Sequence, residues 1–173
     1  VDSDDWLEPE MYAELMGKAV QYHADIVSSG LKREYADSIL EEFDNIEQGF
    51  YNRNDIEQDV FPKMICTGNF YEAGINVHVY NKIFRAKILR KYQLELEDDI
   101  RMGEDAGVVY PCYLNAERIY VLRRSFYHYV LRSDSCMGTQ SVDEGDRLRL
   151  LNRYLIKCVN DTPWRELLVQ QLV

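Results

Sequence analysis

Three acidic residues near the start of the chain form the pattern Asp2-Ser3-Asp4-Asp5, which Trp6 follows directly. Carboxylates two residues apart at a strand end point the same way, so Asp2 and Asp4 could hold one hard cation through oxygen. The spacing does not fit an EF-hand loop, which needs a central glycine and a distal bidentate glutamate. Trp6 also weakens a match to haloacid-dehalogenase phosphatases, which have a small or β-branched residue there. A cation site and a solvated acidic terminus both remain open.

A second acidic pair, Glu104 and Asp105, follows Gly103 at the expected start of a helix. A carboxylate at such a position can act as a general base. Acids in a first helical turn are also stabilised by the helix dipole without any catalysis. The pair by itself therefore leaves both interpretations open.

Three further residues have side chains that suit phosphate oxygens. An arginine fork and a hydroxyl, as in Arg132 and Ser135, can together hold a diphosphate. Lys82 could counter phosphate charge, or lie in water beside Arg85 and Lys87. A surface loop is the competing interpretation of the 132–135 segment.

Charge is unevenly spread along the chain. The 173 residues have a formal net charge of −10, which argues against nucleic acid as a partner. Residues 1–60 contain sixteen acids and four bases, whereas residues 61–173 contain fourteen acids and sixteen bases. Such a division could place a cation and a phosphate side by side, although most of these charges are expected to be solvated surface.

Composition limits the class of protein further. The length suits one domain with its own core. No run reaches the roughly 18 apolar residues of a transmembrane segment. The four cysteines and three histidines are scattered and contain no C-x-x-C pair, so free thiols in a reducing compartment are expected rather than a zinc site.

Hydrophobic periodicity predicts a helix near the start of the chain. Glu8-Pro9-Glu10 is typical of a helix start, because proline suits the first turn and acids favour that end of the dipole. A stripe at helical spacing follows: Met11, Leu15, Ala19 and Tyr22. Residues 24–29 then predict a short strand that ends in a turn at Gly30, and residues 31–55 a polar excursion without a clear period.

The rest of the chain mixes both element types. Pro62 must start, kink or end a helix expected over 56–66, and Pro111 counts against an unbroken helix over 104–115. The other expectations are an extended segment at 77–80, an amphipathic segment at 83–89, a loop at 95–101, strands at 119–122 and 126–131, and helices near 142–158 and 163–172. This mixture defines an α/β fold, with too few strands for a self-sufficient parallel sheet.

Four segments resemble bacterial family-2 glycosyltransferases, in the family's order and with comparable spacing. Each is weak alone, but together they reach from the start of the chain to about residue 137. The segments are VDSDDWLEPEMYAELM at 1–16, YNKIFRAKIL at 80–89, MGEDAGVVYPCYLNAERI at 102–119 and YHYVLRSDSCM at 127–137.

The resemblance implies a partial GT-A fold, the fold of nucleotide-diphospho-sugar transferases. The chain would begin inside the D-x-D motif and lack the N-terminal Rossmann-like half that binds the nucleotide. Residues 1–173 would form a single domain, with acceptor-side elements at 1–137 and C-terminal helices at 138–173.

The same resemblance implies the role of each acidic residue. Asp4 is the first choice as a ligand of Mg²⁺ or Mn²⁺, and Asp5 is the alternative. Asp2 would bind the metal, directly or through water, or hold the ribose. Asp105 matches the position of the catalytic base, with Glu104 as its neighbour. The diphosphate would be held by Lys82, Arg132 and Ser135.

The implied reaction is metal-dependent, inverting transfer of a sugar, of hexosyltransferase type, in the synthesis of a surface polysaccharide. The donor would be a nucleotide sugar, and the acceptor a saccharide or a lipid-linked saccharide. The expected location is the bacterial cytoplasm, with a peripheral position at the inner membrane face as one option. This chain alone is expected to be inactive. The alternative is a non-catalytic binding or assembly module that forms a homodimer through an exposed sheet edge.

Overall fold

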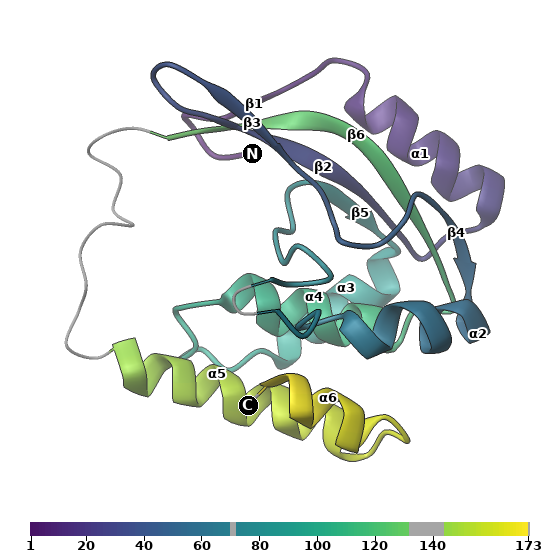
Figure 1. The fold of residues 1–173 in the computed structure, drawn as a ribbon, viewed down its shortest axis with the longest axis vertical. Helices are drawn as coiled ribbons and strands as arrows, with labels where there is room; N and C mark the ends of the chain where they lie inside the picture. The colour runs from purple at the N-terminus through teal and green to yellow at the C-terminus, as the bar shows by residue number, and fades with distance from the viewer. Residues whose placement is uncertain (70–71, 132–143, 173) are drawn as a thin grey trace.

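The computed structural model describes residues 1–69, 72–131 and 144–172, which form a mixed α/β fold. One mixed sheet separates two layers: α1 covers one face, and the other helices lie on the opposite side (Figure 1). Each layer has its own hydrophobic core, a smaller one under α1 and a larger one around α4. The α/β class predicted from the sequence is therefore confirmed.

The sheet is built around a central parallel pair, β2 and β6. Four short strands flank this pair and run antiparallel to the neighbour that each one contacts. β1 and β4 pair with β6, whereas β3 and β5 pair with β2. The strands are β1 (Trp6–Leu7), β2 (Ile26–Glu34), β3 (Ile39–Glu42), β4 (Gly49–Asn52), β5 (Lys82–Phe84) and β6 (Arg118–Val130).

Gly30 lies inside β2, so the predicted turn at this residue is wrong. The register between β2 and β6 shifts on both sides of Gly30, and β6 continues through the corresponding irregularity as one strand where two were predicted. A Cβ at Gly30 would lie 2.5 Å from Cδ1 of Phe43. Glycine is needed here for a close approach of Phe43, not for a turn.

The segment 31–55 was predicted to be an irregular excursion, and this is also wrong. It contains the second half of β2 and all of β3 and β4. β3 extends β2 into a hairpin, and β4 returns to pair with the start of β6. The polar sequence hid these strands because β3 is largely exposed to solvent.

The first helix, α1 (Met11–Tyr22), confirms the predicted stripe, with Met11 and Leu15 fully buried against the sheet. The helix expected over 56–66 is a composite of three short pieces: α2 (Arg53–Asp55), a π-helical turn (Ile56–Val60) and a 3₁₀ turn (Phe61–Lys63). Pro62 lies in the 3₁₀ turn, where it needs no amide hydrogen.

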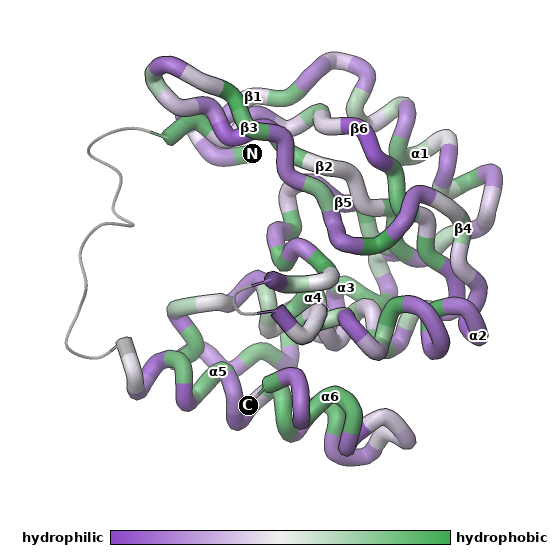
Figure 2. Tube along the Cα trace, viewed as in Figure 1, coloured by the Kyte–Doolittle hydropathy of each residue, from purple (hydrophilic) through white to green (hydrophobic). Residues whose placement is uncertain are grey.

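Four helices enclose the larger core: α3 (Ala86–Glu95), α4 (Glu104–Leu114), α5 (Glu144–Asn160) and α6 (Arg165–Leu172). α4 continues through Pro111, and every residue from 106 to 114 is buried, so packing on all sides maintains the helix despite the proline. Hydrophobic and hydrophilic residues alternate along α5, as expected for a helix that covers a core with one face (Figure 2). None of the helices in the described part of the chain is long and apolar enough to cross a membrane.

Candidate functional site

The acidic N-terminus forms a tight turn directly before β1. The amide of Asp5 donates to the carbonyl oxygen of Asp2 over 3.2 Å. The Asp5 carboxylate accepts from the Tyr127 hydroxyl at 2.8 Å and from the Val130 amide at 2.9 Å. Asp2 and Asp4 are exposed. The turn therefore offers the Asp2 and Asp4 side chains to solvent, whereas both Asp5 oxygens bind within the chain.

Asp105 lies in the first turn of α4, partly buried. Its Oδ2 accepts from the Val79 amide over 3.3 Å. Burial raises the pKa of Asp105, and the nearby negative charges of Glu104 and Asp2 raise it further, against the opposing effects of the Val79 amide and Lys82. Val1, next to Asp2, and Asp105 line one cavity, which places the start of the acidic turn beside the predicted base.

A cavity of about 630 Å³ opens at this site, a volume typical of small-molecule binding sites. Its walls come from the N-terminus, β5, α3 and α4, and both Glu104 and Asp105 line it. The remaining wall is largely apolar, with Tyr80 and Phe84 as aromatic surfaces. A ligand in this cavity would have Asp105 directly beside it.

Lys82 lines the same cavity, but its ammonium group is already bound within the chain. Its ammonium group donates to the carbonyl oxygens of Asn76 at 2.6 Å and His78 at 3.0 Å, and to Oδ1 of Asn81 at 2.8 Å. The side chain is buried, which lowers its pKa. As placed, Lys82 holds the segment that carries Val79, and its contact with a phosphate stays a prediction. Arg132 and Ser135 lie outside the described residues.

An aromatic stack beside the acidic turn was missed by the sequence analysis. Tyr80 stacks on Tyr127 with ring centroids 4.2 Å apart and on His78 at 4.8 Å. The sequence analysis predicted a strand over 126–131, but it gave no sign of the contact between the Tyr127 hydroxyl and Asp5. Burial, together with Lys82 and Arg33, lowers the pKa of His78 to about 4, so its ring is neutral at pH 7.

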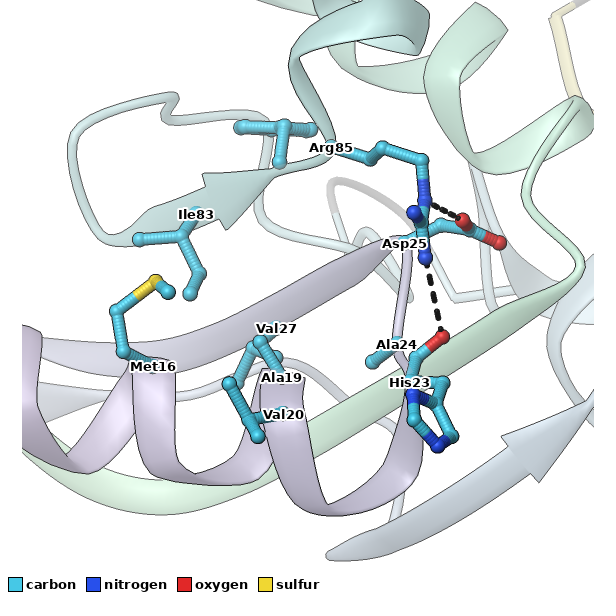
Figure 3. A pocket seen from close by; sticks show the side chains of 10 residues that line it. Met16, Ala19, Val20, His23, Ala24, Asp25, Val27, Ile83 and Arg85 are labelled. Atoms are coloured by element: carbon cyan, nitrogen blue, oxygen red, sulfur yellow. Dashed lines mark hydrogen bonds and ion pairs between the residues drawn. The ribbon is translucent and has the colours of Figure 1, made fainter.

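A second cavity of about 340 Å³ lies between α1 and β5 (Figure 3). Met16, Val20 and Ile83 line its apolar part. At its other end, Nε of Arg85 contacts Oδ1 of Asp25 at 2.5 Å. Asp25 also accepts two backbone amides from the start of β6, so this carboxylate is already used structurally. The cavity beside Asp105 is therefore the better candidate for chemistry.

The acidic turn suits a hard cation whose coordination shell is completed by water and substrate. In the described ranges, no group of three or more His, Cys, Asp or Glu residues is placed to hold a metal ion. Mg²⁺ is usually bound by one or two carboxylates together with water and substrate phosphates. The exposed carboxylates of Asp2 and Asp4 fit that manner of binding.

Gly103 provides a test of how α4 is positioned. Its φ of 70° favours glycine, and a Cβ there would lie 2.6 Å from Cδ2 of Leu151. We expect Gly103→Ala to lower the free energy of unfolding by about 1–3 kcal/mol, measured by urea denaturation. Gly17→Ala is the matched control, since nothing lies within 4 Å of its Cβ, and it should stabilise α1 by up to about 1 kcal/mol. Equal effects of the two changes would contradict this account of Gly103.

The raised pKa of Asp105 predicts a gain in stability when its charge is removed. The folded chain binds the Asp105 proton more tightly than the unfolded chain does, so stability falls as pH rises from the ordinary value of 3.8 through the raised pKa. Asp105→Asn should therefore have a higher Tm than wild type at pH 7, since asparagine still accepts from Val79. Below pH 3.8 the difference should shrink. Thermal unfolding of both proteins across this pH range measures the difference in Tm. An advantage of Asp105→Asn over wild type that is smaller at pH 7 than in acid would contradict the prediction.

Comparison with known proteins supports the fold class. The chain is 24% identical over 135 residues to glycosyltransferase GlyA of Streptococcus pneumoniae, a match that covers 78% of the chain and 19% of GlyA. It superimposes on S. aureus TarS 1–349 in complex with UDP-GlcNAc with a TM-score of 0.65 and 18% identity, over 99% of this chain and 46% of that one. The TarS complex with UDP gives a TM-score of 0.59 at 19% identity, with 99% and 44% covered. No family model matches the sequence.

These likenesses agree with the predicted partial GT-A fold. The chain spans about a fifth of the length of GlyA and less than half of the TarS chains. The mixed α/β fold described above thus corresponds to part of the TarS structure.

Proposed function

We propose that this chain forms the acceptor side of a nucleotide-sugar glycosyltransferase. The observation that carries the proposal is a cavity of about 630 Å³ that both Asp105 and Val1, the residue before the acidic turn, line. Support comes from the likeness to GlyA and from TarS structures that contain UDP-GlcNAc or UDP. UDP-GlcNAc is accordingly the first donor to test.

Each part of the site has a role in sugar transfer. Breaking the anomeric bond passes through an oxocarbenium-like transition state, and negative charge develops on the departing diphosphate. A bound Mg²⁺ or Mn²⁺ would stabilise that charge, with Asp4 as first ligand and Asp2 as second. Asp5 holds the turn in place through β6.

Asp105 is the proposed general base. The acceptor hydroxyl would lie against its carboxylate and lose its proton to it as the new bond forms. Because attack comes from the face opposite the diphosphate, the anomeric centre would invert. The raised pKa of Asp105 suits a base, since the carboxylate then holds the transferred proton more readily.

A second candidate function is an assembly module, and the surface around β5 favours it. β5 pairs with β2 only, so its other edge is unpaired in the described sheet. Beside it, α1 exposes Tyr12, Met16 and Val20 at helical spacing. Exposed apolar surface next to a strand edge suits association with another protein surface, including a second copy.

An assay of nucleoside diphosphate release separates these functions. The full-length protein would be given a panel of nucleotide sugars that includes UDP-GlcNAc, with and without Mn²⁺. The proposal expects Mn²⁺-dependent release that Asp4→Asn abolishes. Release from none of the donors, combined with concentration-dependent self-association of the chain, would favour the assembly module.

A further inference from the structure

One hydroxyl ties the acidic turn to the sheet. The Tyr127 hydroxyl donates to Oδ2 of Asp5 at 2.8 Å and lies 3.4 Å from the amide of Asp2, which donates to it. The Tyr127 side chain is fully buried in the middle of the sheet. The same hydroxyl thus contacts both ends of the turn that carries Asp4.

Tyr127 is in turn fixed against the segment that holds Asp105. Its ring stacks on Tyr80, the residue next to Val79, whose amide binds the Asp105 carboxylate. No described residue pairs with the buried Tyr80 hydroxyl, so Tyr80 contributes its ring rather than a hydrogen bond. A continuous contact therefore runs from Asp5 through Tyr127 and Tyr80 to Asp105.

We propose that Tyr127 is a positioning residue that sets the distance and direction between the acidic turn and Asp105. The binding of a metal ion at the turn rests on the proposed function, whereas the contact between Tyr127 and the turn does not. Without the hydroxyl, the Val130 amide is the one remaining donor to the Asp5 carboxylate among the described residues, and the Asp2 amide loses its hydrogen bond to β6. The turn would then move independently of α4.

Amide hydrogen exchange tests the contact between Tyr127 and the turn without an activity assay. In this chain, Tyr127→Phe should speed exchange at the amides of Asp2 and Asp5 about tenfold or more, since a part-buried hydrogen bond to a carboxylate is lost. Tyr80→Phe is the matched control, because it removes a neighbouring buried hydroxyl for which the described part of the chain offers no partner. It should leave exchange at both amides unchanged.

Mn²⁺ added without substrate then tests the position of Asp105 relative to the acidic turn. In wild type, Mn²⁺ bound at the turn should broaden the NMR signals of Asp4 and also that of Asp105. In Tyr127→Phe, broadening at Asp105 should fall relative to broadening at Asp4. A merely structural tyrosine would lower overall stability without changing that ratio.

The outcomes separate this inference from the proposed function. Unchanged exchange at Asp2 and Asp5 in folded Tyr127→Phe would overturn the inference, whatever Mn²⁺ does. Faster exchange with no Mn²⁺ broadening in wild type would support the contact and count against the metal role of the turn. If Tyr127→Phe does not fold, Asp5→Ala replaces it, because alanine removes the acceptor of the Tyr127 hydroxyl, and faster exchange at Asp5 is then the expected result.

Discussion

Asp105→Asn should reduce sugar transfer by the full-length protein about 10²–10⁴-fold in kcat, the range expected when a general base is lost. Asparagine has the same shape and still accepts from the Val79 amide, so the cavity should stay intact. The KM for the nucleotide sugar should change little, because Asp105 is proposed to act on the acceptor hydroxyl. Initial rates of transfer at saturating donor and acceptor measure the effect.

A control acid distinguishes this loss from a general effect of charge. Asp161 is exposed and does not line the cavity beside Asp105. Asp161→Asn makes the same chemical change and should leave kcat within about twofold of wild type, as expected for a surface substitution. If Asp105→Asn lowers kcat no more than Asp161→Asn does, Asp105 is not the general base.

Asp25→Ala should strongly destabilise the chain. The buried Asp25 carboxylate accepts from Nε of Arg85 and from the amides of Glu117 and Arg118 at 2.9 and 3.1 Å. It thereby joins the starts of β2 and β6 and the end of β5. Alanine leaves two amides without acceptors, which costs about 2–4 kcal/mol in the free energy of unfolding. Arg85 adds less, because its side chain is half exposed.

Urea denaturation of this chain measures that loss. Asp37→Ala is the control, an exposed acid beyond the end of β2, which should change the free energy by no more than about 0.5 kcal/mol. Since Asp25 lines the cavity shown in Figure 3 and not the one beside Asp105, a mild variant at this position should retain donor release. A loss below about 1 kcal/mol would mean that Asp25 does not join the three strands as described.

Elements with a clear period were predictable from the sequence. The stripe that begins at Met11 and Leu15 gave α1, and α5 follows its amphipathic pattern. The strands between residues 31 and 55 were not predictable, because β3 is an exposed edge strand whose pairing partner, not its composition, makes it a strand. Pro111 misled for a related reason, since burial around α4 outweighs its helix-breaking effect.

The site shows the same division between local and long-range information. The Asp2–Asp5 and Gly103–Asp105 motifs are local patterns, and Val1, next to the first motif, lines the same cavity as Asp105; their shared role in catalysis stays a prediction. Tyr127 could not be assigned from sequence, because its contact with Asp5 spans 122 positions along the chain. Lys82 looked free in the sequence, but its acceptors lie on a loop whose path only the fold determines.

A crystal structure of the full-length protein with an unreactive nucleotide sugar and Mn²⁺ tests the central claim most directly. The account predicts the diphosphate and Mn²⁺ at the turn that carries Asp2 and Asp4, with the sugar entering the cavity beside Asp105. The Asp105 carboxylate should face the anomeric carbon from the side opposite the diphosphate. A donor bound away from this turn, or an Asp105 carboxylate on the same side as the diphosphate, would contradict the assignment of both acidic groups.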